Sequence, residues 1–258
     1  MKLRRVIGMA VAFNLLMTSA AAVSVNTAFA ETIDTADAYS EDFNGFGETN
    51  YKDIDVQGDN VDKRELRRAA AACRDALSEE ERMDATEGIL WSLLMLPEYA
   101  RAETVFLYDG FGSEPYTRMW ARYFLQKGKQ IVYPRTAGSG IMDFYQVASM
   151  DDLVSGRFGI QEPDVHCPLV TPQKGDLILT PGLLFDATGH RLGYGGGFYD
   201  KYKERFPEAV YIGAAFDISR IDFLLPAEPW DMTLDGLVTE AGIWRFTNNE
   251  LSTEREQS

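Results

Sequence analysis

The feature that most constrains this chain is a glycine-rich stretch between an apolar, strand-like segment and a helix-like segment. The segment 181–186 reads Pro-Gly-Leu-Leu-Phe-Asp, and residues 191–200 read Arg-Leu-Gly-Tyr-Gly-Gly-Gly-Phe-Tyr-Asp. Because glycines lack side chains, successive backbone N–H groups can turn toward one point, where they bind phosphate. The N-terminus of the following helix and the guanidinium of Arg191 add positive charge. The stretch therefore predicts a phosphate-binding loop.

Other interpretations of this loop require different residues. A glycine cluster can be a turn that only permits tight packing, but Arg191, Tyr199 and Asp200 favour a binding role. A dinucleotide-binding fingerprint would need glycine where Phe198 stands. A P-loop would need Gly-Lys-Ser or Gly-Lys-Thr, which is absent. The sequence favours a phosphate loop of a different kind.

Composition narrows the class of ligand. The 258 residues carry 40 acidic and 25 basic side chains, a net charge of −15, so a broad surface for nucleic acid is not expected. An anionic ligand must therefore be held by a local site. The two cysteines, Cys73 and Cys167, exclude a disulfide scaffold and multi-cysteine zinc sites. The two histidines, His166 and His190, are assigned no catalytic or metal role.

The first 60 residues differ from the rest in composition. Residues 1–30 combine early basic residues, an apolar stretch and the ending Ala-Phe-Ala, a pattern typical of a secretory signal peptide. A single membrane anchor, or a start codon placed too far upstream, remains open for the same segment. Residues 31–60 read as a disordered acidic linker, and 251–258 as a polar tail. The catalytic-size domain is expected at 61–250.

Hydrophobic periodicity within that domain alternates between strand and helix patterns. Two helices are expected to start at capping boxes formed by Asp62 with Glu65 and by Ser78 with Glu81. The pattern predicts an α/β domain in which a parallel crossover links the first two strands. Helices are predicted at 62–76, 78–96, 115–127 and from the glycine cluster to 206, and strands at 104–108, 129–133 (ended by Pro134), 142–147, 176–180, 210–215, 236–239 and 243–246.

A series of motifs in one order gives the chain a resemblance to a known family. The motifs are Lys63-Arg-Glu-Leu-Arg67, Phe106-Leu107 before Glu114-Pro-Tyr-Thr117, Tyr133-Pro134, the segment 181–186, the stretch 191–200, and Leu225-Pro226 through Asp231 to Thr239-Glu240. From about residue 62 to 240 the sequence resembles the 5-formyltetrahydrofolate cyclo-ligase family, also called 5,10-methenyltetrahydrofolate synthetase. The stretch 191–200 is nearly specific to that family.

The resemblance implies a single three-layer α/β domain around a mostly parallel central sheet. It also implies a ligase that converts 5-formyltetrahydrofolate to 5,10-methenyltetrahydrofolate with ATP as cosubstrate and Mg²⁺ as cofactor, releasing ADP and phosphate. The expected partners are these small molecules, with no nucleic acid and a membrane only through residues 1–30. The alternative is an exported or tethered relative that binds nucleotide or folate without turnover. A requirement for ATP and reduced folates predicts a cytoplasmic location for the protein, whereas the signal-like residues 1–30 predict export or attachment to a membrane.

The resemblance also assigns site residues, each named by its position here. Lys63, Arg67 and Arg191 are the expected catalytic cations, and Asp200 and Asp231 the expected magnesium ligands. ATP is expected to contact Lys63, Arg64, Glu65, Leu66, Arg67, Arg191, Leu192, Gly193, Tyr194, Gly195, Gly196, Gly197, Phe198 and Tyr199. The folate is expected to contact Leu107, Glu114, Phe198 and Tyr199.

Most of these residues also have a plainer interpretation. Lys63 and Arg67 lie four residues apart, which is also the pattern of a solvated charged helix face. Leu107 suits the core of a strand, and Glu114 suits an acid that stabilises a helix start. The tryptophans, Trp91, Trp120, Trp230 and Trp244, are predicted to be packing residues.

Overall fold

The computed structural model describes residues 62–138, 140–156 and 159–246. The predictions for the signal-like segment 1–30, the linker 31–60 and the tail 251–258 lie outside the described residues. Within the described ranges, no helix is long and apolar enough to cross a membrane.

Three of the described helices begin where the sequence supplies a side-chain cap or a proline. The Asp62 carboxylate accepts a hydrogen bond from the N–H of Arg64 at 2.8 Å, and Ser78 forms a complete capping box with Glu81. Pro97 opens a further short helix directly after the second predicted one. The described α-helices are α3 (Lys63–Asp75), α4 (Glu79–Leu94), α5 (Pro97–Arg101), α6 (Thr117–Gln126) and α7 (Phe198–Arg205).

Eight of the described strands form one sheet in the order β12-β11-β10-β7-β1-β2-β3-β6. The neighbours from β11 through β10, β7 and β1 to β2 are parallel, and β12, β3 and β6 pair antiparallel at the two sides. This confirms the prediction of a mostly parallel central sheet. The strands are β1 (Thr104–Phe106), β2 (Gln130–Thr136), β3 (Met142–Val147), β6 (Leu169–Val170), β7 (Leu177–Thr180), β10 (Val210–Ala214), β11 (Gly236–Thr239) and β12 (Gly242–Arg245).

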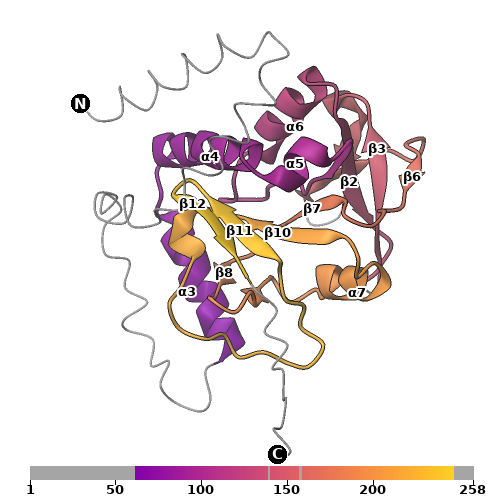
Figure 1. Ribbon diagram of the computed structural model, residues 1–258. Helices are drawn as coiled ribbons and strands as arrows, with labels where there is room; N and C mark the ends of the chain where they lie inside the picture. Colours follow the sequence, from indigo (N-terminus) through magenta and orange to yellow (C-terminus); the bar gives the residue numbers. More distant parts are fainter. Residues whose placement is uncertain (1–61, 139, 157–158, 247–258) are drawn as a thin grey trace, which may run out of the picture. The chain divides into compact units, whose positions relative to one another are not determined.

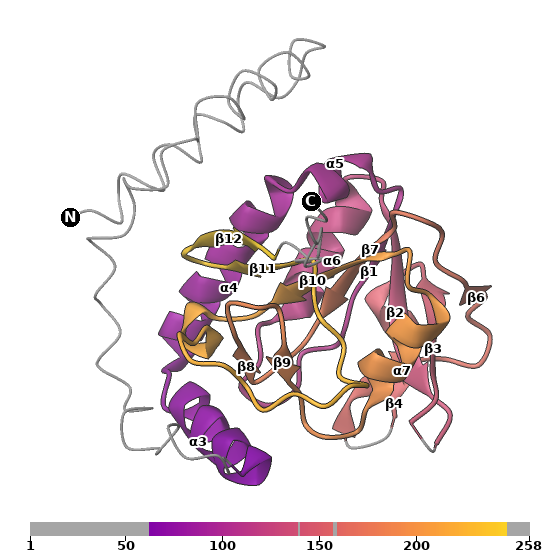
Figure 2. The ribbon, with the colours of Figure 1, turned by 60° about the horizontal axis from the view of Figure 1, so that its bottom comes forward.

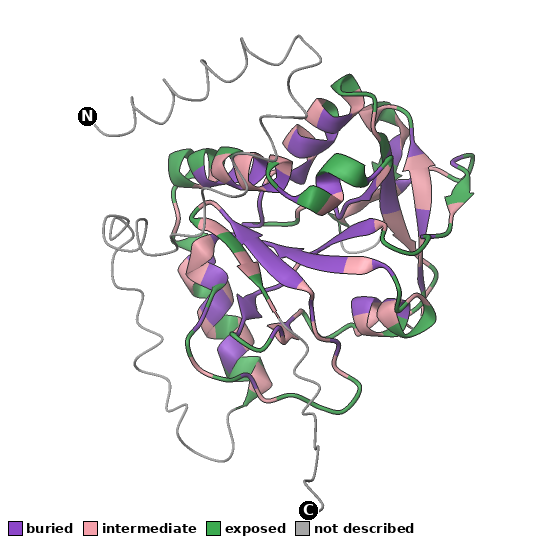
Figure 3. Cartoon of the chain, in the orientation of Figure 1, coloured by how far each residue is buried: buried purple, intermediate pink, exposed green. Residues whose placement is uncertain are grey.

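Helices cover both faces of this sheet (Figure 1). α4, α5 and α6 lie on one face, where Trp120 and Phe124 of α6 are fully buried, which confirms a packing role for Trp120. α7 lies on the other face, with the Tyr202 ring centroid 5.0 Å from that of Phe144 on β3. Figure 3 shows the buried sheet between helices whose outer sides are exposed. The described part therefore has the layered α/β fold that the resemblance implies.

α3 belongs to a smaller hydrophobic cluster, separate from the main core. Its residues Leu66 and Ala70 pack with Leu184 and Leu192 from the β8–β9 hairpin, strands Leu184–Phe185 and Arg191–Leu192. Figure 2 shows α3 beside this hairpin, away from α5 and α6. The hairpin carries the chain directly into the glycine stretch, so α3 and the predicted phosphate loop are brought to the same place.

The prediction that Pro134 ends its strand is wrong, because β2 continues to Thr136. Beyond Val132, the strand β1 no longer pairs with β2, and only β3 remains as a partner. A proline is tolerated there, since its missing N–H removes no ladder bond on the free side. The short hairpin β8–β9 and the pair β4 (Leu153–Ser155) with β5 (Gln161–Pro163) were not predicted.

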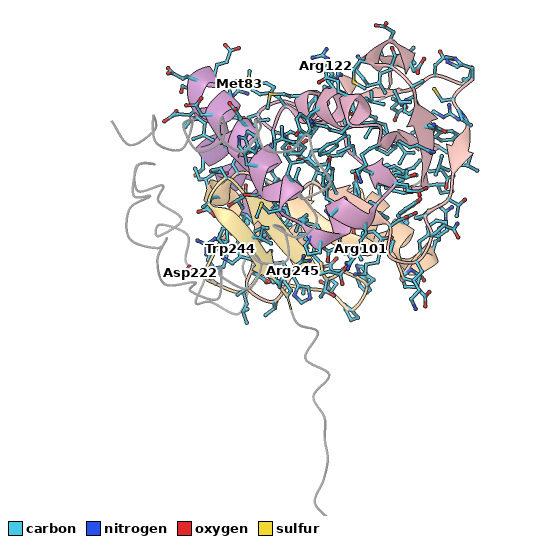
Figure 4. All side chains as sticks on the ribbon, turned by 45° about the horizontal axis from the view of Figure 1, so that its top comes forward. Met83, Arg101, Arg122, Asp222, Trp244 and Arg245 are labelled. Carbon is cyan, nitrogen blue, oxygen red and sulfur yellow. The ribbon has the colours of Figure 1, made fainter. Side chains whose placement is uncertain are left out.

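Side chains connect the edge strand β12 to two other segments, and Figure 4 labels Trp244 and Arg245 on this strand. Arg245 forms an ion pair with Glu98 of α5 at 2.6 Å. Trp244 lies under the guanidinium of Arg220, with the guanidinium carbon 4.6 Å from the ring centroid. These contacts cover the edge of the sheet opposite β6.

Candidate functional site

A cavity of about 1530 Å³ opens at the carboxyl ends of the parallel strands. Tyr108 and Asp109 follow β1, Thr136 ends β2 and Pro181 follows β7, and all of them line it. Ligand sites in open α/β sheets occur at this edge. Because a typical small-molecule site occupies roughly 300–1,000 Å³, the cavity has room for two ligands.

The glycine loop forms one wall, and its glycines are required by its geometry. Gly195 has φ +93° and Gly197, at the start of α7, has φ +64°, both in the left-handed region that other residues rarely adopt. A Cβ on Gly193 would lie 2.7 Å from Nη1 of Arg191. The absence of side chains therefore lets arginines approach the loop backbone.

Arg67 and Arg191 place their guanidinium groups against this loop. Arg67 donates from Nε to the carbonyl of Gly193 at 2.7 Å. The Arg191 side chain is 7% exposed, and its Nη2 lies 3.3 Å from Oδ2 of Asp200. Its Nε has no hydrogen-bond acceptor within the described part of the chain. Burial lowers the pKa of Arg191, against the opposing effect of Asp200. A buried donor without an acceptor at a cavity wall fits an anionic ligand.

Two carboxylates lie beside these cations. Asp231 Oδ2 accepts from Nζ of Lys63 at 2.8 Å and from the N–H of Glu228 at 2.9 Å. Burial alone would raise the pKa of Asp231, but these two hydrogen bonds outweigh it and hold that pKa below its usual value. Asp200 Oδ1 accepts from the N–H of Met232 at 3.2 Å, which brings it next to the Asp231 segment.

The carboxylates of Asp200 and Asp231 can be compared with the ligands that Mg²⁺ prefers in proteins. Among the described residues, no group of three or more His, Cys, Asp or Glu side chains could hold a metal ion. Mg²⁺ is usually held by one or two carboxylates together with phosphate oxygens and water. Asp200 and Asp231 are oxygen ligands of that kind on the wall that carries the cations, so the pair fits Mg²⁺ in the company of phosphate.

A second part of the cavity wall, named here the Glu114 end, contains a buried carboxylate, Glu114, which is 5% exposed. Its Oε2 accepts from the N–H of Phe111 at 2.9 Å, whereas Oε1 has no hydrogen-bond donor among the described residues. Burial raises the pKa of Glu114, although nearby Arg74 and the Phe111 N–H act in the other direction. The hydroxyl of Tyr199, on the cavity wall, is likewise buried without a described partner. This end offers a buried acceptor and an aromatic surface.

A comparison of the sequence with models of protein families identifies the family of this chain. The model of the 5-formyltetrahydrofolate cyclo-ligase family matches residues 59–240, well over half of the chain. The chain belongs to the 5-formyltetrahydrofolate cyclo-ligase family. It is therefore an enzyme of this ligase family, and the matched range contains every predicted site residue.

Individual members of the family agree with this assignment. The 5-formyltetrahydrofolate cyclo-ligase of Escherichia coli strain K12 is 29% identical over 178 residues, covering 67% of this chain and 97% of that protein. The NMR structure of Aquifex aeolicus 5,10-methenyltetrahydrofolate synthetase is 34% identical, with a TM-score of 0.64, and the match covers 76% of this chain and 96% of that one. The Mycoplasma pneumoniae 5,10-methenyltetrahydrofolate synthetase is 25% identical, with a TM-score of 0.56, covering 69% and 99%.

Most site residues predicted from the family resemblance line the cavity. The exceptions are Arg64, Glu65, Leu66 and Leu107. Arg64 and Glu65 are exposed on α3, and Leu66 and Leu107 are fully buried in hydrophobic clusters. The structure thus favours the core interpretation of Leu107. The residues it brings together on the wall are Lys63, Arg67, Glu114, Arg191, Leu192, Gly193, Tyr194, Gly195, Gly196, Gly197, Phe198, Tyr199, Asp200 and Asp231.

Some residues of the site were not predicted. Tyr108 and Asp109 line the cavity, and their place directly after a parallel strand was the signal that could have found them. Trp230, predicted to pack, is 72% exposed at the cavity rim, so that prediction is wrong. Arg74 contacts Glu114 and Tyr194 without lining the cavity. Helical spacing could have indicated Arg74, because it follows Arg67 by two helical turns and therefore lies on the same face of α3.

Proposed function

We propose that this chain converts 5-formyltetrahydrofolate to 5,10-methenyltetrahydrofolate with ATP and Mg²⁺, releasing ADP and phosphate. Family membership and the name of the E. coli relative support the cyclo-ligase reaction. The observation that carries the ATP-dependent part is the buried Nε of Arg191, which lacks an acceptor beside the glycine loop. A triphosphate in the loop would supply that acceptor, with Lys63 and Arg67 on the same wall.

The proposed chemistry is phosphoryl transfer followed by ring closure. The formyl oxygen attacks the terminal phosphorus of ATP, the bond from that phosphorus to the bridging oxygen breaks, and ADP leaves. The neighbouring folate nitrogen then attacks the activated formyl carbon. The carbon–oxygen bond breaks, phosphate departs with the former formyl oxygen, and the attacking nitrogen loses its proton to solvent. No side chain forms a covalent bond, so catalysis rests on positioning and charge neutralisation.

Each group on the cation wall has a part in that chemistry. Lys63, Arg67 and Arg191 neutralise the phosphate oxygens, and the glycine N–H groups hold them in place. Asp200 and Asp231 are the residues that would hold Mg²⁺, which when bound neutralises charge on the same oxygens. Until a ligand arrives, the ion pairs of Asp200 with Arg191 and of Asp231 with Lys63 keep these side chains on the wall.

The Glu114 end suits the reduced pteridine. Oε1 of Glu114, which has no described donor, is an acceptor for a ring N–H or the amino group of the pteridine. Phe198 and Tyr199 contribute aromatic surface on the cavity wall. The two ligands would then meet between Glu114 and the glycine loop.

Turnover of the full-length chain tests the proposal. The protein is incubated with ATP, MgCl₂ and 5-formyltetrahydrofolate that carries a heavy-oxygen label in its formyl group. We expect equal amounts of ADP, phosphate and methenyl product, with the label recovered in phosphate. Binding of ATP or folate without any turnover would contradict the proposal and would support a non-catalytic binding relative.

We also propose that the reaction takes place in the cytoplasm, where ATP and reduced folates are available. The mass of the native N-terminus tests this. A mature chain that begins at Glu31 would indicate cleavage and export, whereas a native chain whose first residue lies further into the acidic linker, beyond Glu31, would support the cytoplasmic assignment.

A further inference from the structure

Arg74 is a buried cation in the last turn of α3 that the sequence motifs do not assign. Its side chain is 5% exposed, although arginine is rarely buried without partners. Its Nε donates to Oγ of Ser113 at 3.0 Å, and its Nη2 donates to the hydroxyl of Tyr194 at 2.5 Å. Its Nη1 lies 3.8 Å from Oε1 of Glu114. The three nitrogens of one guanidinium thus reach two different loops.

Both loops contribute residues to the wall of the cavity. Ser113 and Glu114 belong to the loop after β1, and Ser113 also donates to the carboxylate of Asp75 at the end of α3. Tyr194 belongs to the glycine loop and lines the cavity. Arg74 is therefore the point at which α3 joins the loop predicted to hold phosphate to the loop that carries the buried carboxylate.

One face of α3 carries cations to both ends. Lys63 and Arg67 are four residues apart, and Arg74 follows Arg67 by seven, so all three project from the same side. Seven residues of helix span roughly 10 Å. The helix thus places Lys63 beside Asp231 and Arg67 beside Gly193, and it places Arg74 where Tyr194 of the glycine loop comes near Glu114.

We propose that Arg74 is a positioning residue, which holds the Glu114 carboxylate in its binding orientation and ties it to Tyr194 of the glycine loop. The inference rests on the proposed function, because it takes Glu114 as the group that binds the pteridine. A carboxylate buried in a largely apolar environment is held in its charged form by a cation within about 4 Å. Arg74 occupies that place without contacting the substrate.

The groups that face Glu114 decide how its titration responds to loss of Arg74. Arg74 is the facing cation, and the N–H of Phe111 donates to the carboxylate. Asp109 acts in the opposite direction, and the hydroxyls of Tyr108, Tyr194 and Tyr199 surround the site. Without Arg74, burial and Asp109 prevail, so the pKa of Glu114 rises further. As the pH is lowered, Glu114 should then be protonated earlier, and folate binding should be lost at a higher pH than in the unaltered protein.

The test is equilibrium binding of 5-formyltetrahydrofolate to the full-length chain, which needs no turnover. We expect Arg74→Gln to weaken folate binding by about tenfold or more and to move its loss to higher pH. Arg68→Gln, an exposed arginine on the same helix, is the matched control and should behave as the unaltered chain. In a protein that already carries Glu114→Gln, Arg74→Gln should weaken folate binding by less than about twofold, because the carboxylate that Arg74 positions is no longer present.

If the Arg74→Gln variant does not fold, Arg74→Lys is measured in its place. Lysine keeps the charge but not the planar fork, so the pH profile should be retained while folate affinity falls by only about threefold. Equal effects of Arg74→Gln with and without Glu114, or an unshifted pH profile, would overturn the positioning role. Absence of turnover in the unaltered chain would instead count against the proposed function and leave this binding test readable.

Discussion

The two ends of the cavity are built from different kinds of groups. The glycine-loop end combines the glycine backbone with Lys63, Arg67 and Arg191, so in the proposed function several donors would share one anionic ligand. The Glu114 end depends on one buried carboxylate oxygen without a described donor. Where several donors share a ligand, the loss of one side chain is tolerated, whereas the loss of a single buried acceptor is not. A change in the glycine backbone, by contrast, displaces several donors at once. Substitutions at the two ends should therefore differ in size and in the ligand they affect.

The largest effect is expected at the glycine-loop end, where the backbone itself is the donor. Gly195→Val places a β-branched side chain at φ +93° and within 3.5 Å of the Arg67 guanidinium. We expect ATP affinity to fall about a hundredfold or more, measured by calorimetry. Gly175→Val, at φ +82° in a turn outside the cavity, is the control for backbone strain. An unchanged ATP affinity in folded Gly195→Val would remove the loop from the site.

The next effect belongs to the Glu114 end. Glu114→Gln keeps the size of the side chain but removes its charge, so folate binding should weaken by roughly 1–3 kcal/mol while ATP binding stays nearly constant. Because burial raises the pKa of Glu114, folate affinity of the unaltered chain should fall as the pH is lowered through that raised value. The glutamine variant should lose this pH dependence.

An alternative role for Glu114 predicts a different result. If it only stabilised the start of α6, the substitution would lower Tm and leave the Michaelis constant for folate unchanged. Measuring both quantities on the same protein separates the two roles, and an unchanged Michaelis constant would falsify the binding assignment.

A smaller effect is expected for the two carboxylates of the cation wall. Asp200→Asn and Asp231→Asn should each lower kcat/KM by about tenfold, and excess MgCl₂ should partly restore it, because one ligand of the ion is weakened. Asp222→Asn, at an exposed position labelled in Figure 4, is the control. A defect that does not respond to the magnesium concentration would count against metal binding by these residues.

The smallest effect is expected at the cavity rim. Trp230→Ala should change the free energy of unfolding by less than about 0.5 kcal/mol, because the side chain is 72% exposed and fills no core space. Chemical denaturation measures this directly. Large-to-small substitutions in a core lower the free energy of unfolding by about 2–5 kcal/mol. If Trp230→Ala lowers it by about 2 kcal/mol or more, Trp230 is a packing residue after all.

Local signals in the sequence predicted much of this molecule. The Ser78 capping box, the parallel crossover from β1 to β2 and the start of a helix within the glycine cluster each depend on neighbouring residues, and the structure confirms them. Leu66 and Leu107 were harder to predict, because motif membership does not say which way a side chain points. Both project into hydrophobic clusters.

Arg74 and Pro134 depend on contacts that no local pattern contains. The partners of Arg74 lie 39 and 120 residues away in sequence, at Ser113 and Tyr194. The continuation of β2 through Pro134 depends on where the neighbouring strand β1 stops. Such features follow from the folded arrangement of distant segments.

The most direct test of the account is a cross-comparison of two ligands and two variants. Equilibrium affinities for ATP and for 5-formyltetrahydrofolate are measured on the full-length chain, on Gly195→Val and on Glu114→Gln. The account predicts that Gly195→Val weakens ATP binding at least tenfold more than folate binding, and that Glu114→Gln weakens folate binding at least about fivefold more than ATP binding. Equal losses of both ligands in both variants would contradict a cavity with one end for the nucleotide and another for the folate.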